Sequence, residues 1–234
     1  GGEEKGLIKM HIEPGIVDGA KMALAVGTAA GAFGYAAKLA AEDIADSNIA
    51  AFGAKTGLAA IGTFIFFEVL PHFPVGVSEV HFILATTLFL MLGAAPAALG
   101  LALGLLVQGT FFAPQDLSMF FVNATTLLVP LFAITALARR VIPKRTAYVD
   151  LDYTQVLKLS AMYQGGVVAW VAFWAFYGQG VGVDTFQSVW TFAAAYILVV
   201  LIEPVADLAA LGIAKKMRGR GTSPILNDRL FNAA

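Results

Sequence analysis

The chain contains three histidines and no cysteine, so a transition-metal site would have to use nitrogen or oxygen ligands. His11 stands in the stretch MHIEP, residues 10–14. If Met10 is the first residue, its α-amino group, the His11 backbone nitrogen and a His11 imidazole nitrogen can close fused chelate rings on one metal ion. A second imidazole could supply a fourth nitrogen. Four nitrogens in a plane suit Ni²⁺ or Cu²⁺, and six-coordinate or distorted variants suit Co²⁺.

The other two histidines, His72 and His81, have carboxylates close to them in the sequence. Glu68 precedes His72, and Glu79 precedes His81. A carboxylate can orient a metal-bound imidazole, so these acids and His72 are candidates for supporting a site or admitting the ion. The alternative is that Glu68 reaches water at a helix end and that the loop histidines only form hydrogen bonds.

The composition indicates which elements must position these residues. Hydrophobic residues make up 59% of the 234 residues and charged residues 13%, against about 25% charged in soluble domains. Because a spanning helix needs about 20 mostly apolar residues, we predict an all-α membrane protein, a bundle of about seven transmembrane helices. The predicted spans cover residues 16–41, 50–70, 79–95, 97–113, 117–140, 153–177 and 185–214. Glycine pairs four residues apart, at 27/31, 53/57 and 100/104, favour close helix packing in lipid.

The distribution of basic residues predicts the orientation of the bundle. ARRVIPKR follows the fifth predicted span, and KKMRGRG follows the seventh. Cytoplasmic loops are rich in Lys and Arg, and seven spans put both clusters on one side. We therefore expect the N-terminus outside, the C-terminus in the cytoplasm, all three histidines at the outer face, and a multi-pass location in the inner cell membrane.

Two acidic residues, Glu203 and Asp207, share one face of the seventh predicted span. Charges inside a span are costly and are usually functional or paired. The pair is a candidate for a cation exit path or a cytoplasmic coupling contact, and the alternative is a structural ion pair with Lys158, Lys21 or Lys38.

Several motifs are absent from the sequence. There is no phosphate-binding GxxxxGK(S/T) loop, no HExxH and no nucleophile constellation, so an enzyme is not expected. The net charge of −1 gives no reason to expect a nucleic-acid partner, and no organic cofactor is predicted. Energy for uphill transport would have to come from separate ATPase subunits.

Two blocks of sequence together resemble a known family. MHIEPG, at residues 10–15, is similar to the MHI…G start of the CbiM/NikM family. Residues 73–132 resemble the family's Gly-rich loop that ends in a histidine opening a helix, its Q…FF stretch (here LVQGTFF) and its helix with an internal Asn. In this chain those features are His81, Gln108 and Asn123. The family comprises the cobalt- or nickel-capturing membrane components of energy-coupling factor transporters.

The resemblance implies that Co²⁺ or Ni²⁺ is the bound substrate. Its ligands would be the Met10 amine, the His11 backbone and imidazole nitrogens, and His81. Asn123 would help hold the N-terminal segment, which would fold into the mouth of the bundle. The implied partners are a coupling transmembrane subunit and ATPase subunits of an energy-coupling factor transporter, together with the lipid bilayer that surrounds the chain.

Two other readings remain open. Nine residues, GGEEKGLIK, precede Met10, and we interpret residues 1–9 as an N-terminal extension or an expression remnant and residues 10–234 as one transmembrane domain. This extension, together with two loops that depart from the family pattern, GVSEVHF and FFAPQD, motivates an accessory or structural membrane subunit that kept the fold and lost metal transport. The glycine-rich bundle is also compatible with a channel or secondary carrier.

Overall fold

The computed structural model describes residues 12–219, 223 and 225–233, and these residues are predominantly helical. The long helices are α1 (Met22–Asp46), α2 (Ile49–Phe64), α4 (Ala94–Phe111), α5 (Phe120–Val141), α6 (Tyr153–Gln179) and α7 (Val183–Lys216). The short helices are α3 (Ala85–Leu92) and α8 (Asp228–Phe231), and the strands are β1 (Phe73–Val75) and β2 (Ser78–Val80). A π-helical turn, Ile65–Val69, extends α2, and 3-10 turns lie at Gly19–Lys21, Pro114–Met119 and Tyr148–Asp150.

In the described part of the chain, six helical stretches are long and apolar enough to cross a membrane. They are Gly19–Asp46, Ile49–Val69, Ala94–Phe111, Pro114–Val141, Tyr153–Gln179 and Val183–Lys216. These stretches correspond to six of the predicted spans, with ends that differ by a few residues. The predicted all-α membrane class is therefore confirmed, with one short β-hairpin added.

The predicted third span, residues 79–95, is not a continuous helix. It begins in β2, passes through residues 81–84 without regular structure, and becomes helical only in the eight residues of α3. Eight residues rise only about 12 Å, too little to cross a bilayer. Leu84, with φ of 53°, lies in the left-handed region just before α3 and prevents the helix from extending backwards. The prediction of seven spanning helices is not confirmed, because apolarity alone did not distinguish this interrupted segment from a helix.

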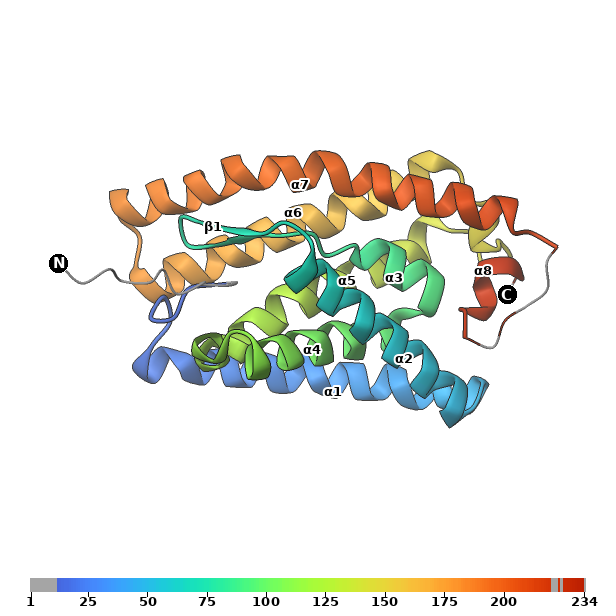
Figure 1. Ribbon diagram of the computed structural model, residues 1–234, viewed down its shortest axis with the longest axis horizontal. Helices are drawn as coiled ribbons and strands as arrows, with labels where there is room; N and C mark the ends of the chain where they lie inside the picture. The colour runs from blue at the N-terminus through green and yellow to red at the C-terminus, as the bar shows by residue number, and fades with distance from the viewer. Residues whose placement is uncertain (1–11, 220–222, 224, 234) are drawn as a thin grey trace.

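The interrupted segment nevertheless carries the chain back across the bundle. In Figure 1, α2 runs from the right-hand end towards the middle, the hairpin reaches to the left, and α3 returns to the right. As a result α1 begins at one end of the molecule and α7 finishes at the other. This arrangement is compatible with termini on opposite sides, and which side is cytoplasmic stays a prediction.

Both basic clusters belong to the end of the molecule where α7 finishes. Arg218 forms an ion pair with Asp150, and Lys215 donates a 2.7 Å hydrogen bond to the Leu151 carbonyl, in the loop that follows the first cluster. Arg229 of α8 donates to the Pro143 carbonyl at 2.9 Å, so α8 also packs at this end. The two Lys/Arg clusters that predict the cytoplasmic side therefore lie at the same end of the bundle.

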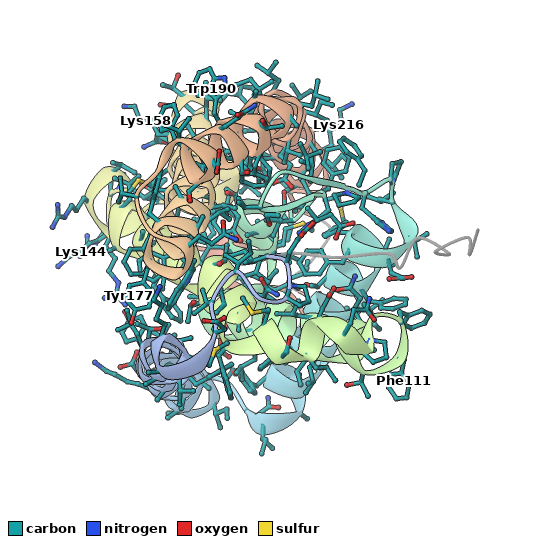
Figure 2. The ribbon with its side chains drawn as sticks, turned by 90° about the vertical axis from the view of Figure 1, so that its left-hand side faces the viewer. Phe111, Lys144, Lys158, Tyr177, Trp190 and Lys216 are labelled. Atoms are coloured by element: carbon teal, nitrogen blue, oxygen red, sulfur yellow. The ribbon has the colours of Figure 1, made fainter. Side chains whose placement is uncertain are left out.

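Large apolar side chains on the outside of the bundle fit a lipid-facing surface. Figure 2 shows the molecule from the end where α1 begins, with Trp190 and Phe111 projecting outward. These two side chains are 67% and 74% exposed, respectively. The central helices α4 and α5 contribute the most buried residues among the spans, so the core lies along them.

Gly100 and Gly104 pack α4 against α2. A Cβ atom added at Gly100 would lie 2.2 Å from the Ala59 Cβ, whereas one added at Gly57 would meet nothing within 4 Å. We therefore expect Gly100→Ala to destabilise the protein by about 1–3 kcal/mol, the usual cost of overpacking, and Gly57→Ala to have little effect. Thermal unfolding in detergent measures both, and equal midpoints for the two variants would contradict this packing.

Candidate metal-binding site

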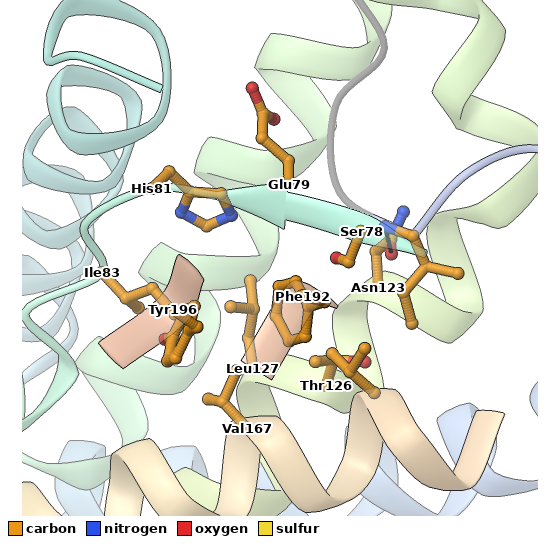
Figure 3. Close-up of a pocket in the computed structure, with 12 residues that line it drawn as sticks. Ser78, Glu79, His81, Ile83, Asn123, Thr126, Leu127, Val167, Phe192 and Tyr196 are labelled. Atoms are coloured by element: carbon orange, nitrogen blue, oxygen red, sulfur yellow. Dashed lines mark hydrogen bonds between the residues drawn. The ribbon is translucent and has the colours of Figure 1, made fainter. Parts of the chain in front are cut away.

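A small pocket lies between the hairpin and the helices α5, α6 and α7, in the half of the bundle away from the basic clusters. It leaves about 20 Å³ of free space, enough for one water-sized particle. The residues that line it are Ile12, Ser78, Glu79, His81, Ile83, Asn123, Thr126, Leu127, Val167, Val171, Phe192 and Tyr196. Most of these are labelled in Figure 3.

The hairpin that supplies Ser78, Glu79 and His81 is seated tightly against α7. Its turn uses Gly76 with φ of 63°, and a Cβ added there would lie 2.2 Å from the Ser188 carbonyl oxygen. Only glycine allows both this conformation and this close approach. The tight turn therefore fixes the position of β2 along α7. It thereby also fixes the residues that β2 contributes to the pocket wall.

His81 follows β2 directly and is 6% exposed. Its Nδ1 lies 3.2 Å from the Phe82 carbonyl oxygen, and its ring packs on Phe67 with 4.4 Å between ring centroids. A proton on Nδ1 donated to that carbonyl places the lone pair on Nε2, which is how backbone carbonyls commonly orient metal-binding histidines. The predicted ligand His81 is thus on the pocket wall, with its ring orientation constrained.

The first described residues enter the same pocket. The Ile12 amide donates a 3.0 Å hydrogen bond to Asn123 Oδ1, and the Glu13 amide donates to the Val77 carbonyl at 3.3 Å. Ile12 is 1% exposed. The two other predicted ligands, Met10 and His11, lie outside the described residues. What the structure does place is the residue that follows His11, and it lies in the pocket wall with His81.

The carboxylates near the histidines are arranged in two ways. Glu79 lines the pocket and is 2% exposed, and its Oε1 lies 3.9 Å from His72 Nε2. In Figure 3 its carboxylate points away from Val167 and Leu127. Glu68, in contrast, is not among the pocket residues, and its Oε2 accepts a 3.4 Å hydrogen bond from Gln108. The structure therefore brings His72 to a pocket residue but places Glu68 with α4.

Glu203 and Asp207 are buried in α7, at 1% and 2% exposure. Neither forms an ion pair with any lysine in the described part of the chain, so the lysine partners considered from sequence are wrong. Glu203 instead accepts hydrogen bonds from the Ile83 amide and from the Gln164 side chain. Asp207 accepts from the Thr87 amide at 3.1 Å and from its hydroxyl at 2.6 Å. Both acids therefore accept hydrogen bonds from backbone amides just before α3 or in its first turn. No helical turn precedes α3 to supply carbonyl oxygens for these amides.

The described residues do not form a metal site by side chains alone. Across the described ranges, no group of three or more His, Asp or Glu residues is placed to hold a metal ion. A site here would need nitrogen ligands from the segment before Ile12, which is the ligand set expected from the sequence. The pocket contributes one imidazole and a space of about the size of a single water molecule.

Sequence reasoning missed several pocket residues, including Ser78, Thr126, Phe192 and Tyr196. Tyr196 is 1% exposed and donates a 2.7 Å hydrogen bond to Gln164 Oε1. These residues carry no local motif. A tyrosine and a glutamine facing each other from two apolar spans are visible only once α6 and α7 are paired.

The fold is that of a multi-pass helical membrane protein, with a small pocket beside His81 in one half of its bundle. A family model described as the cobalt uptake substrate-specific transmembrane region, CbiM, matches residues 11–220. The chain belongs to the CbiM family of cobalt uptake membrane components. No curated protein and no solved structure shows significant similarity to it.

Asn123 offers a test of the link between the N-terminal segment and the pocket. Replacing it with alanine removes the only described side-chain acceptor for the buried Ile12 amide. We expect Asn123→Ala to weaken Co²⁺ binding roughly 10- to 100-fold, as loss of an outer hydrogen-bond partner of a metal site does. Asn48→Ala, which removes the cap of α2 and its 2.9 Å bond from Ala51, is the control and should leave affinity unchanged. Isothermal titration measures both, and equal affinities would contradict the link.

Proposed function

We propose that this protein is the metal-capturing component of a cobalt or nickel uptake transporter of the energy-coupling factor type. The ion would be held by the Met10 amine, the His11 backbone and imidazole nitrogens, and His81. The observation that carries this proposal is the hydrogen bond from the Ile12 amide to Asn123, in the wall of the pocket that also contains His81. That bond brings the residue after His11 to the predicted second histidine.

Nitrogen ligands and a small enclosed space suit a dehydrated divalent transition-metal ion better than a hydrated one. Both Co²⁺ and Ni²⁺ accept imidazole and amine nitrogens, and the family description favours cobalt. With the N-terminus outside, the pocket would face outward in the cell membrane. Separate ATPases would then drive reorientation of the bundle to release the ion inside.

The outer faces of α1 and α2 are available to a coupling membrane subunit. A Cβ added at Gly27, Gly31, Gly53 or Gly57 would meet nothing within 4 Å, so these small-residue faces pack against nothing in the described structure. Small residues at this spacing support close helix contacts between membrane subunits. The basic loop after α5 is the second surface that a cytoplasmic partner would reach.

Metal uptake tests the proposal as a whole. Cells or proteoliposomes that contain the chain together with its coupling and ATPase subunits should accumulate Co²⁺ or Ni²⁺ only when ATP is hydrolysed. Uptake by liposomes that contain the chain alone would instead indicate a channel or secondary carrier. Stable co-purification with a large complex that lacks ATPases, without metal binding, would indicate an accessory subunit.

A further inference from the structure

The interrupted segment between β2 and α3 places main-chain amides inside the bundle, where no preceding helical turn can accept them. Non-helical backbone at membrane depth is tolerated only where it is buried in protein or lines a cavity. Here the Ile83 amide is satisfied by Glu203 of α7. Ile83 is two residues after His81, and both line the pocket. Glu203 therefore holds the stretch of backbone that carries the predicted metal ligand.

Glu203 also reaches the pocket by a second path through side chains. Its Oε2 accepts from Gln164 Nε2, so the other end of the Gln164 amide, Oε1, faces Tyr196 and accepts its hydroxyl hydrogen at 2.7 Å. Tyr196 lines the pocket. One carboxylate therefore sets both the backbone beside His81 and the direction in which the Tyr196 hydroxyl points.

Asp207 provides an internal comparison for this role. It lies one turn further along α7, is as deeply buried, and accepts its hydrogen bonds from Thr87, six residues after His81. It does not line the pocket that contains His81. Asp207 thus supports the start of α3 without contacting the groups that shape the pocket.

We propose that Glu203, acting through the Ile83 amide and Gln164, is a positioning residue for metal capture, which sets the placement of His81 and the hydroxyl direction of Tyr196. This inference rests on the proposed function, because it concerns how the same pocket holds its ion. It assigns to Glu203 a role in binding geometry in place of an exit path.

The conservative variant Glu203→Gln changes one oxygen into an amide NH₂. That group would face either the Ile83 N–H or the Gln164 NH₂, so two donors would meet. The conflict is relieved only by reversing the Gln164 amide, which makes Tyr196 accept where it now donates. The substitution therefore alters the pocket wall even in a fully folded protein.

The test compares Glu203→Gln with Asp207→Asn in the form of the chain, beginning at Gly1 or at Met10, that binds Co²⁺. We expect Glu203→Gln to weaken Co²⁺ binding roughly 10- to 100-fold and to shift the visible absorption of the bound Co²⁺. Asp207→Asn should keep the wild-type affinity and spectrum, even if its thermal midpoint falls. A purely structural role would lower stability in both variants without moving the spectrum.

Wild-type affinity and spectrum in folded Glu203→Gln would overturn the inference and leave the proposed function intact. Failure of the wild-type chain to bind Co²⁺ would remove the proposed function and the inference with it. If Glu203→Gln does not fold, Gln164→Met takes its place, because it removes the donor to Glu203 and the acceptor for Tyr196 at similar volume. Unchanged affinity and spectrum in that variant would equally overturn the inference.

Discussion

Replacing His81 with alanine is expected to weaken Co²⁺ binding by more than about 100-fold, beyond the usual cost of losing an outer partner of a metal site. His81 is the one imidazole in the described pocket wall, and its Nδ1 contact with the Phe82 carbonyl directs Nε2 for coordination. Without it, the N-terminal nitrogens would lack their fourth planar ligand. Isothermal titration with Co²⁺ in detergent provides the measurement.

Two control variants make the result specific for the ligand. His81 packs on Phe67, so alanine also leaves a gap, whereas His81→Gln fills more of that volume and still lacks the imidazole. His72→Ala removes a histidine that contacts Glu79 but does not line the pocket, and should cost less than about 10-fold. Wild-type affinity in both His81 variants, with folding intact, would show that the ion binds elsewhere.

The second large effect is expected from the position of the α-amino group. An α-amine has a pKa of about 8 and loses its proton readily to a bound metal ion, whereas a peptide nitrogen gives up its proton far less easily. A chain that begins at Met10 should therefore bind Co²⁺ or Ni²⁺ at least about 100-fold more tightly than one that begins at Gly1.

A chain that begins at Met10 and carries an acetyl group on the Met10 amine is the matched control for this prediction. Acetylation removes the basic amine while adding little bulk, so this form should bind as weakly as the chain that begins at Gly1. The intact mass of the mature protein from its native membrane shows which form the cell uses. Equal affinities for all three forms would exclude the Met10 amine as a ligand.

Much of the fold could be predicted from apolar segment lengths alone. Spanning helices need long apolar runs, and six of the seven predicted runs are such helices. The remaining run, residues 79–95, could not be recognised as an interrupted segment. Its backbone amides are bound by Glu203 and Asp207, which lie about 120 residues further along the chain. An apolar run looks the same whether its amides are satisfied within a helix or by carboxylates from a neighbouring one.

The residues of the pocket wall were predictable where they carry a motif and not where they depend on helix pairing. His81 and Asn123 belong to recognisable stretches, and both line the pocket. Tyr196 and Gln164 have no such context, because their contact joins two spans across the bundle. Tyr196 and Gln164 lie close to the break before α3. Membrane transporters commonly bind their substrates at such discontinuous segments, where these line a cavity.

The metal content of the purified chain that begins at Met10 tests the central claim most directly. Elemental analysis of this form should find about one cobalt or nickel ion per chain, because the pocket has room for a single ion. Absence of metal both in the protein as purified and after loading with Co²⁺ would contradict metal capture by this pocket.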